Sequence, residues 1–456
     1  MLDKYSIKVM FYGVFMVGLD GWKRTNMLGE IKKGLGGREV IVMGFVRETR
    51  DIGKLRFIIL GDITGNAQVL LKGKEEIARF GDFTKESVIA VKGTVKENLE
   101  VVSGAEIVPS DIRLITKAET PLPIQVYGRT DALLDTRLDW RFLDIRKPKN
   151  ALVFKIETTI EMAMREYWIK NGFLEIHSPK LMGAPSETGA DLFPVVHFDR
   201  TAYLAQSPQF YKQMAMCAGL DRVFEIGPVF RAEPSNTTRH GTEYTSIDME
   251  MSWIESHEDV MEFEERWLVH VMKRVKETHG EEIRKMYGVD VIVPKLPIPR
   301  ISFNEAKNIS NKAIGKTGAD DDLTDEGERV VGETINRKDG SEFVFVKEYP
   351  WSKKPFYHMR KEDDPSVTKG YDLIFNGVEI TTGSQREHRY EVLIHQAKEK
   401  GLSLESVKFY TDFFKYGVPP HGGFGFGLTR LIKQMLHMEN IREATFAFRD
   451  MKRLFP

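Results

Sequence analysis

Hydrophobic and polar residues alternate between positions 38 and 115 in five short runs that are rich in β-branched and aromatic side chains. Turn residues separate the runs, as at Asp62–Gly65, and a short helical stretch over Lys74–Phe80 lies between the third and the fourth run. Five strands with a helix at that point predict an OB-type β-barrel, with another small β-barrel as the alternative. The expected strands are Arg38–Val46, Lys54–Asp62, Asn66–Leu71, Ser87–Val95 and Glu106–Ile115.

Two longer segments carry the three-to-four-residue spacing of amphipathic helices. The first, Ala151–Lys170, is followed by Asn171 and Gly172, which are helix stop signals, and the second, His257–His279, is followed by Gly280. Strand-like runs lie between and after these helices, without a regular strand–helix–strand alternation. We therefore expect an α+β fold, in which a large antiparallel sheet is flanked by helices and preceded by the barrel.

The pattern breaks at residues 116–148, where the prolines at 121 and 123 and a charged stretch without a clear period indicate a hinge. The expected organisation is an N-terminal extension at 1–21, a barrel domain at 22–115, this hinge, and a larger domain at 149–456. Within the extension, the apolar run Val9–Leu19 is shorter than the roughly 20 residues that a membrane span needs. We interpret it as a buried strand, or as sequence upstream of a translation start near Met27.

The cysteine and histidine content and the net charge limit the kinds of site and partner that the chain can have. Cys217 is the only cysteine and the histidines show no metal-type spacing, which excludes disulfides, thiolate zinc sites and iron–sulfur clusters. A reducing compartment, the cytoplasm, is expected. The net charge of −1 gives no overall sign of a nucleic-acid partner, so RNA binding would depend on local patches of Lys and Arg.

A predicted hairpin carries the first group of candidate residues. Phe230–Glu233 reads as the end of a strand, and a loop of about seven residues leads to Glu243 and Tyr244 on a return strand. Arg231 and Glu233 would share one side of the strand, because residues two apart face the same way. Arg231 would be a fixed cation for a phosphate, and Glu233 an acceptor for an amino-purine. The alternative is an exposed hairpin with solvated charges.

Two further groups are suited to a nucleotide. The glycine-rich stretch His421–Arg430 allows close approach of backbone to a ligand and runs into a helix, although tight packing would also explain it. It matches neither a P-loop nor a dinucleotide-binding fingerprint. Asp372, Glu379 and the Thr382 hydroxyl are hard oxygen ligands suited to Mg²⁺ on a triphosphate. The alternative for them is a pair of carboxylates on a sheet surface.

The last group combines a carboxylate, an amide and an ammonium. Glu187 in Ser186–Ala190 is followed some twenty residues later by Gln209 and Lys212. Together these three side chains could recognise an amino acid, whereas Lys212 alone reads as a surface lysine.

Taken in this order, the four groups resemble class II aminoacyl-tRNA synthetases from about residue 22 to the C-terminus. The helix that ends at Gly172, with Phe173–Lys180 after it, resembles motif 1, a dimer-interface element. Phe230–Tyr244 resembles motif 2 and Gly423–Arg430 resembles motif 3. Three ordered motifs make this a specific resemblance.

Further strings narrow the resemblance to the archaeal and eukaryotic branch of aspartyl-tRNA synthetases. These are Ser186–Pro194, Gln206–Gln213 and Gly377–Arg389. The resemblance implies that ATP activates L-aspartate as an adenylate and that tRNA(Asp) then accepts it. It also implies Mg²⁺ as cofactor and a homodimer. No membrane association is expected, because no segment of the sequence approaches the length of a membrane span. An asparaginyl-tRNA synthetase is the nearest alternative, but that branch lacks a cation at Lys212. A synthetase-like asparagine synthetase would lack the barrel, and a non-catalytic relative would lack the motif arginines.

The resemblance also implies residue roles, with Arg231 and Arg430 as catalytic groups. The implied ATP site is Arg231, Glu233, Arg239, His240, Tyr244, Glu379 and Arg430. The implied aspartate site is Glu187, Gln209, Lys212, Arg231, Asp248, Thr382 and Arg386. The implied Mg²⁺ ligands are Asp372, Glu379 and Thr382, and the implied tRNA contacts are Arg47, Phe57 and Gln68, with burial of Phe57 in the barrel core as the alternative.

Some positions depart from the family pattern. Thr429 replaces a usual glutamate in motif 3, Phe448 replaces a usual proline, and Gly241-Thr242 stands where Leu-Asn or Leu-Thr is common. In archaeal relatives, a Trp and a Lys near the anticodon loop accompany strict specificity for tRNA(Asp). Arg47 and Val102 occupy these positions here and match neither the strict nor the relaxed pattern, so charging of tRNA(Asn) as well is an open hypothesis.

Overall fold

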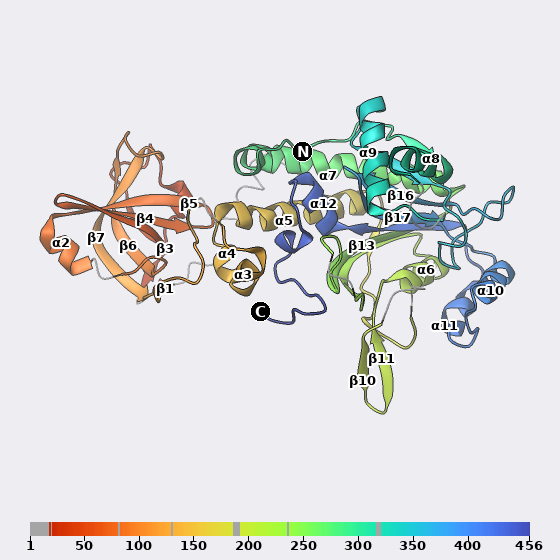
Figure 1. Ribbon diagram of the computed structural model, residues 1–456. Helices are drawn as coiled ribbons and strands as arrows, with labels where there is room; N and C mark the ends of the chain where they lie inside the picture. Colours follow the sequence, from red (N-terminus) through yellow and green to blue (C-terminus); the bar gives the residue numbers. More distant parts are fainter. Residues whose placement is uncertain are drawn as a thin grey trace. The chain divides into compact units, whose positions relative to one another are not determined.

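The protein is described from a computed structural model that covers residues 18–19, 21–80, 83–128, 131–185, 192–234, 237–315 and 321–456. Most of the N-terminal extension, including most of the apolar run Val9–Leu19, lies outside these residues. The chain divides into two compact units, Met1–Ala151 and Leu152–Pro456 (Figure 1), and each is described by itself.

The first unit contains a closed five-stranded barrel in the order β3-β4-β5-β7-β6, which confirms the predicted OB-type architecture. All its pairings are antiparallel except β5 with β7. The helix α2 lies between β5 and β6, as expected from the sequence. The bounds are β3 Glu39–Ile52, β4 Leu55–Asp62, β5 Gly65–Lys72, α2 Gly73–Phe80, β6 Val88–Glu97 and β7 Ala105–Thr116.

Alternation of burial along the strands explains why this sequence closes into a barrel. In β3, Val40 and Val42 are buried in the barrel core with Ile58, Val69 and Val91 from neighbouring strands. Strand β3 extends six residues beyond its predicted end at Val46, because the polar residues that follow still pair with β4 in a two-stranded ladder. Before the barrel lie β1 Gly18–Leu19, β2 Trp22–Lys23 and the 3₁₀ helix η1 Leu28–Glu30.

Residues 116–148 contain two short helices, α3 Leu134–Asp139 and α4 Arg141–Asp144, which the missing period did not predict. Three buried charges hold them together: Asp144 accepts from Arg137 Nε at 2.9 Å and from Arg141 Nη1 at 2.7 Å. This ion-pair cluster, together with a small apolar cluster that includes Ile124, Val126 and Leu143, organises the segment.

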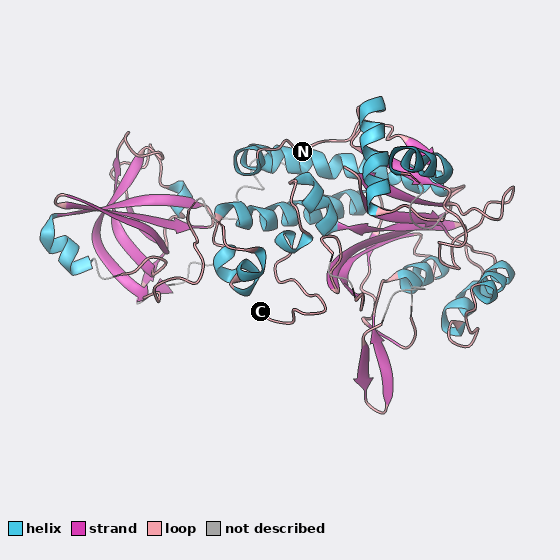
Figure 2. Ribbon diagram, viewed as in Figure 1, coloured by secondary structure: helices cyan, strands magenta, loops and turns pink. Residues whose placement is uncertain are grey.

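The second unit is built on an eight-stranded sheet in the order β14-β15-β16-β17-β18-β13-β12-β8 (Figure 2). The pairs are antiparallel except at the two edges, where β14·β15 and β12·β8 are parallel. This confirms the predicted large antiparallel sheet. The bounds are β8 Leu174–Glu175, β12 Arg222–Phe230, β13 Glu243–Ser252, β14 Arg300–Ser302, β15 Phe343–Lys347, β16 Gly370–Phe375, β17 Val378–Gln385 and β18 His421–Gly427.

Three helices pack on the sheet and form the main core: α5 Pro148–Lys170, α7 His257–Tyr287 and α12 Leu428–Met435. The prediction that Gly280 ends α7 is wrong. The helix continues to Tyr287 and ends at Gly288, whose φ is 74°. Packing explains the difference, since Ile283 beyond Gly280 is fully buried and outweighs the roughly 1 kcal/mol helix penalty of a glycine.

The remaining elements lie around this framework. A three-stranded sheet has the order β10-β11-β9, and its β10–β11 hairpin projects from the unit (Figure 1). Among the helices that the structure describes, none combines the length and the apolar composition needed to cross a bilayer. The bounds are β9 Leu181–Met182, β10 Pro194–His197, β11 Arg200–Leu204, α6 Gln209–Cys217, α8 Phe303–Ile314, α9 Asp325–Asp339, α10 Tyr390–Glu399, α11 Lys408–Thr411, η2 Asp412–Tyr416 and η3 Ile441–Ala444.

Candidate active site

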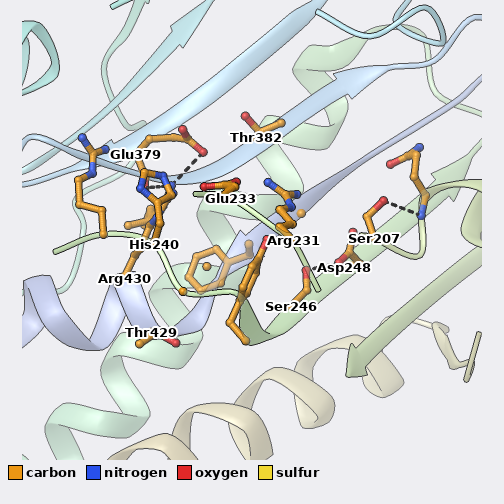
Figure 3. A pocket seen from close by; sticks show the side chains of 18 of the residues that line it. Ser207, Arg231, Glu233, His240, Ser246, Asp248, Glu379, Thr382, Thr429 and Arg430 are labelled. Carbon is orange, nitrogen blue, oxygen red and sulfur yellow. Dashed lines mark hydrogen bonds and ion pairs between the residues drawn. The ribbon is translucent and has the colours of Figure 1, made fainter. Parts of the chain in front are cut away.

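A cavity of about 550 Å³ lies over the middle of the eight-stranded sheet (Figure 3). Its walls come from β13, β17, β18, the loop between β12 and β13, and the start of α12. Lys212 and Asp372 do not line the cavity, and Glu187 lies outside the described residues. Of the predicted site residues, the cavity is lined by Gln209, Arg231, Glu233, Arg239, His240, Tyr244, Asp248, Glu379, Thr382, Arg386 and Arg430.

The connection between β12 and β13 differs from the predicted hairpin. β12 ends at Phe230, so Arg231 and Glu233 lie in the connecting loop, which runs to Thr242 and is longer than the expected seven residues. One more ladder bond follows, from the Arg231 N–H to the Thr242 carbonyl at 2.9 Å. The Arg231 guanidinium lies 5.8 Å from the Tyr244 ring centre, so a cation and an aromatic face adjoin in the cavity wall.

Arginines gather at the end of the cavity near α12. Nη1 of Arg430 donates to the Glu379 carbonyl at 3.0 Å and lies 3.4 Å from its carboxylate. Arg239 pairs with Asp325 and Glu328 at the start of α9, each at 2.5 Å. Fixed guanidinium groups of this kind suit a triphosphate, whose oxygens would replace carboxylates as their partners.

Two buried groups beside these arginines have shifted pKa values. Burial lowers the pKa of His240, and the neighbouring Arg430 lowers it further, so the imidazole is neutral and bonds the Thr237 hydroxyl at 2.8 Å. Burial raises the pKa of Glu328 to about 7, and the nearby Glu379 adds to the shift. Sequence reasoning missed Glu328, because it lies about fifty residues before Glu379 and joins the site only through the fold.

The predicted Mg²⁺ ligands lie on neighbouring strands. Asp372 of β16 is paired across the ladder with Thr382 of β17, whose hydroxyl donates to its carboxylate. Lys354 also donates to Asp372, at 2.8 Å, and sequence reasoning did not anticipate this cation. Burial raises the pKa of Glu379, and the negative charge of Asp372 raises it further, as expected where a cation would balance carboxylates.

This donor set fits Mg²⁺ as a partial site. Among the described residues, no three His, Cys, Asp or Glu side chains form a metal cluster. Two carboxylates and a hydroxyl are nevertheless the usual protein share of a Mg²⁺ site that substrate phosphates and water complete.

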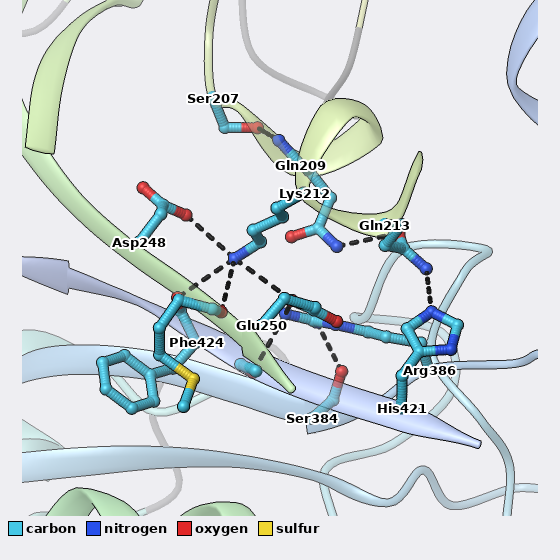
Figure 4. Close-up of polar contacts among 12 residues, drawn as sticks. Ser207, Gln209, Lys212, Gln213, Asp248, Glu250, Ser384, Arg386, His421 and Phe424 are labelled. Carbon is cyan, nitrogen blue, oxygen red and sulfur yellow. Dashed lines mark hydrogen bonds and ion pairs between the residues drawn. The ribbon is translucent and has the colours of Figure 1, made fainter. Parts of the chain in front are cut away.

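At the opposite end of the cavity, Lys212 and Arg386 converge on one buried carboxylate, Glu250 (Figure 4). Arg386 donates to Glu250 from Nε at 2.9 Å and from Nη2 at 3.2 Å. The Lys212 ammonium donates to Asp248 at 2.9 Å and lies 3.5 Å from Glu250. Lys212 is only 2% exposed, so the alternative of a surface lysine is wrong.

Glu250 was missed by sequence reasoning, although a signal was present. Asp248 and Glu250 stand two apart in strand β13, each between apolar neighbours, so both face the same side of the sheet. They bring two negative charges to the two cations, and the cluster of these four side chains is neutral overall.

The three predicted RNA-binding residues of the barrel differ in how deeply they are buried. Phe57 is half-buried and belongs to no core cluster. Gln68 of β5 pairs with Ile59, which lies two residues after Phe57 on β4, and the Gln68 side chain donates to Glu106 at 2.9 Å. Arg47 is buried and held by Glu86 at 2.8 Å. Phe57 is therefore not part of the barrel core, whereas the Arg47 guanidinium is buried in an ion pair.

Comparison with known proteins decides the family. The sequence pattern described as tRNA synthetases class II (D, K and N) matches residues 134–451, and that of the OB-fold nucleic acid binding domain matches residues 40–115. The chain belongs to the class II aminoacyl-tRNA synthetases. This confirms the resemblance drawn from the three motifs, and such synthetases use ATP.

Two curated relatives of this synthetase are named as aspartate ligases. The chain is 45% identical to the aspartate–tRNA(Asp) ligase of Pyrococcus abyssi over 95% of this chain and 100% of that protein. It is 44% identical to the aspartate–tRNA(Asp/Asn) ligase of Aeropyrum pernix over 93% and 97%.

Solved structures agree with this placement. A putative aspartyl-tRNA synthetase from Leishmania major matches with a TM-score of 0.88 at 30% identity, over 99% of this chain and 100% of that one. The asparaginyl-tRNA synthetase of Pyrococcus horikoshii with asparaginyl-adenylate matches with a TM-score of 0.87 at 33% identity, over 94% and 98%.

Two departures of this synthetase from its family pattern are explained by one contact. A Cβ added to Gly241 would lie 2.8 Å from the ring of Phe448, so the glycine makes room for that ring. Phe448 is buried in the cavity wall, with the Arg442 guanidinium 5.1 Å from its ring centre. The third departure, Thr429, lines the cavity, and nothing in the structure explains why it replaces glutamate.

Proposed function

We propose that this synthetase is an aspartate–tRNA ligase that forms aspartyl-adenylate from L-aspartate and ATP and transfers the aspartyl group to tRNA. The observation that carries the proposal is the pair of buried cations, Lys212 and Arg386, beside the amino-acid end of the cavity. The high identity to aspartate ligases over nearly the whole chain supports it.

The reaction needs no protein nucleophile. The α-carboxylate of aspartate attacks the α-phosphorus of ATP in line, and pyrophosphate leaves. Arg231 would hold the α-phosphate and the substrate carboxylate, with Glu233 and Tyr244 on the adenine. His240, Arg239 and Arg430 would contact the outer phosphates. Preorganised charges of this kind lower the barrier by positioning the reactants and stabilising the developing negative charge.

Asp372, Glu379 and Thr382 would hold Mg²⁺, which supplies charge neutralisation on the triphosphate when bound. At the other end, Asp248, Gln209 and Glu187 would orient the α-ammonium of aspartate. The hydroxyl of the terminal adenosine of tRNA then attacks the adenylate carbonyl and releases AMP.

The preference for aspartate over asparagine follows from charge. A β-carboxylate that loses its water needs cations, and Arg386 reaches the cavity while Lys212 stands behind Asp248. An asparagine amide would turn its NH₂ donors towards these donors. Sites built around a polar group reject analogues that lack it by about 10⁴-fold.

Aspartate-dependent exchange of labelled pyrophosphate into ATP tests this activity, with asparagine as the competing substrate. We expect exchange with aspartate and none above background with asparagine. Equal exchange with both, or exchange with asparagine alone, would contradict the proposal.

We further propose that the enzyme aspartylates tRNA(Asn) as well as tRNA(Asp). Val102 is fully exposed and Arg47 is buried against Glu86, so neither supplies a tryptophan platform and a lysine donor for the third anticodon base. Several relatives are named Asp/Asn ligases. Charging of the two transcripts should differ by less than about a hundredfold, which is roughly 2.7 kcal/mol; a larger preference would refute the proposal.

A cytoplasmic homodimer completes the proposal. The segment that resembles motif 1 exposes Ile169 and Leu174 by half or more, and so does Leu181 directly after it, as expected for a face that a second copy covers. Sedimentation should give twice the chain mass, and a monomer at micromolar concentration would contradict the dimer.

A further inference from the structure

Behind the amino-acid end of the cavity, a buried row of hydrogen bonds leads to Gln209 (Figure 4). Gln209 lines the cavity, and its side-chain NH₂ donates to Oε1 of Gln213 at 2.8 Å. Nε2 of Gln213 lies 2.9 Å from Nε2 of His421, and Nδ1 of that imidazole lies 2.9 Å from the Pro419 carbonyl. Gln213 and His421 are completely buried.

The Pro419 carbonyl fixes the direction of every bond in this row. A carbonyl oxygen only accepts, so Nδ1 of His421 must carry the proton. Burial lowers the pKa of His421 to about 4, which keeps the ring neutral and leaves Nε2 as an acceptor. Gln213 must then donate its NH₂ to His421 and offer its oxygen on the other side.

Two donors meet that oxygen: the NH₂ of Gln209 at 2.8 Å and the Tyr410 hydroxyl at 3.0 Å. With its NH₂ committed to Gln213, the Gln209 amide cannot turn over without placing two acceptors against each other. Its carbonyl oxygen is therefore the atom left for the cavity. Within the part of the chain that the structure describes, that oxygen has no hydrogen-bond partner among protein groups.

We propose that Gln213 and His421 are positioning residues that hold the Gln209 carbonyl oxygen towards the α-ammonium of the amino-acid substrate. An ammonium has only donors, so its site needs acceptors, and Asp248 in the same wall is a second one. An amide free to rotate would present NH₂ to the ammonium in part of the molecules. The inference rests on the proposed aspartate-activating function and adds the residues that enforce recognition of the amino group.

The test compares aspartate with succinate, which has both carboxylates but no α-amino group. In wild type, the KM for aspartate in pyrophosphate exchange and the Ki of succinate against it define an amino-group preference. Gln213→Met removes the acceptor for the Gln209 NH₂. It should raise the KM for aspartate about tenfold or more, as for loss of a hydrogen bond to a charged group, and leave the succinate Ki and the KM for ATP within about twofold.

Two further variants separate positioning from packing. Gln213→Glu keeps an oxygen that accepts from Gln209, and a proton on His421 would balance its charge, so the amino-group preference should be retained. Tyr410→Phe removes a donor without altering the direction of the row and serves as the matched buried control. If Gln213→Met does not fold, His421→Met, which leaves the Gln213 amide free to turn, is measured in its place with the same expected loss.

The inference is overturned if aspartate and succinate weaken equally in Gln213→Met, if the preference does not change, or if Gln213→Glu loses it as fully as methionine does. A failure of the proposed function would look different, because wild-type enzyme would then show no aspartate-dependent exchange at all.

Discussion

Replacing Lys212 by methionine should damage both the fold and the recognition of aspartate. The ammonium is 2% exposed, donates to Asp248 at 2.9 Å and to the Phe424 carbonyl at 3.0 Å, and lies 3.5 Å from Glu250. Methionine keeps the volume but leaves two carboxylates facing Arg386 alone, a net charge of −1 in a buried cluster. Breaking a buried pair in this way costs about 3–5 kcal/mol.

The same excess negative charge opposes a substrate carboxylate, so kcat/KM for aspartate should fall by at least about 150-fold, equivalent to 3 kcal/mol. Thermal unfolding and pyrophosphate exchange measure the two effects. Adding Glu250→Gln to Lys212→Met should recover much of the stability without restoring the activity. A variant within about 0.5 kcal/mol of wild type, the range of a surface substitution, would refute this reasoning.

Three other predictions follow from individual contacts. Burial raises the pKa of Glu264, bonded by the Tyr371 hydroxyl, to about 8, above its unfolded value of 4.5, so it stays protonated in the fold and stability falls as pH rises from about 4.5 to 8. Glu264→Gln should therefore stabilise the enzyme at pH 7 by up to about 3 kcal/mol and flatten its Tm-against-pH curve relative to wild type, and parallel curves would contradict the shift. Gly241→Leu should raise the KM for ATP and lower Tm because the new side chain meets the Phe448 ring, and Phe448→Pro should restore both; a harmless single variant would show that the ring gives way. Phe57→Ala should raise the KM for tRNA by roughly 5- to 150-fold, equivalent to about 1–3 kcal/mol, without changing pyrophosphate exchange, and tRNA affinity should fall with salt; an unchanged tRNA KM would exclude stacking on Phe57.

Local patterns in the sequence predicted the elements that depend on local periodicity. Alternation located the barrel strands, and helical spacing located α5 to within three residues at its start. The end of α7 was wrong because Gly280 is a local signal, whereas burial of Ile283 is set by distant packing. The motif 2 connection was wrong because the length of a loop is not encoded in strand periodicity.

In the candidate site, too, the residues with a local sequence signal were predicted and those without one were missed. Residues that stand in family motifs, such as Arg231 and Glu379, were found in the sequence and line one cavity. Their partners were missed: Glu250, Glu328 and Lys354 each lie on another element than the group they pair with. A buried ion pair has no sequence spacing of its own, so only the fold reveals that Lys212 is a member of a neutral cluster rather than a free cation.

Aspartylation of tRNA(Asp) transcript with labelled amino acid, at fixed salt, tests the central claim most directly. One enzyme preparation is supplied with ATP, Mg²⁺ and either aspartate or asparagine, and acid-precipitable aminoacyl-tRNA is counted. We predict full charging with aspartate and none above background with asparagine. Charging with asparagine alone would place the chain among asparagine ligases and contradict the account.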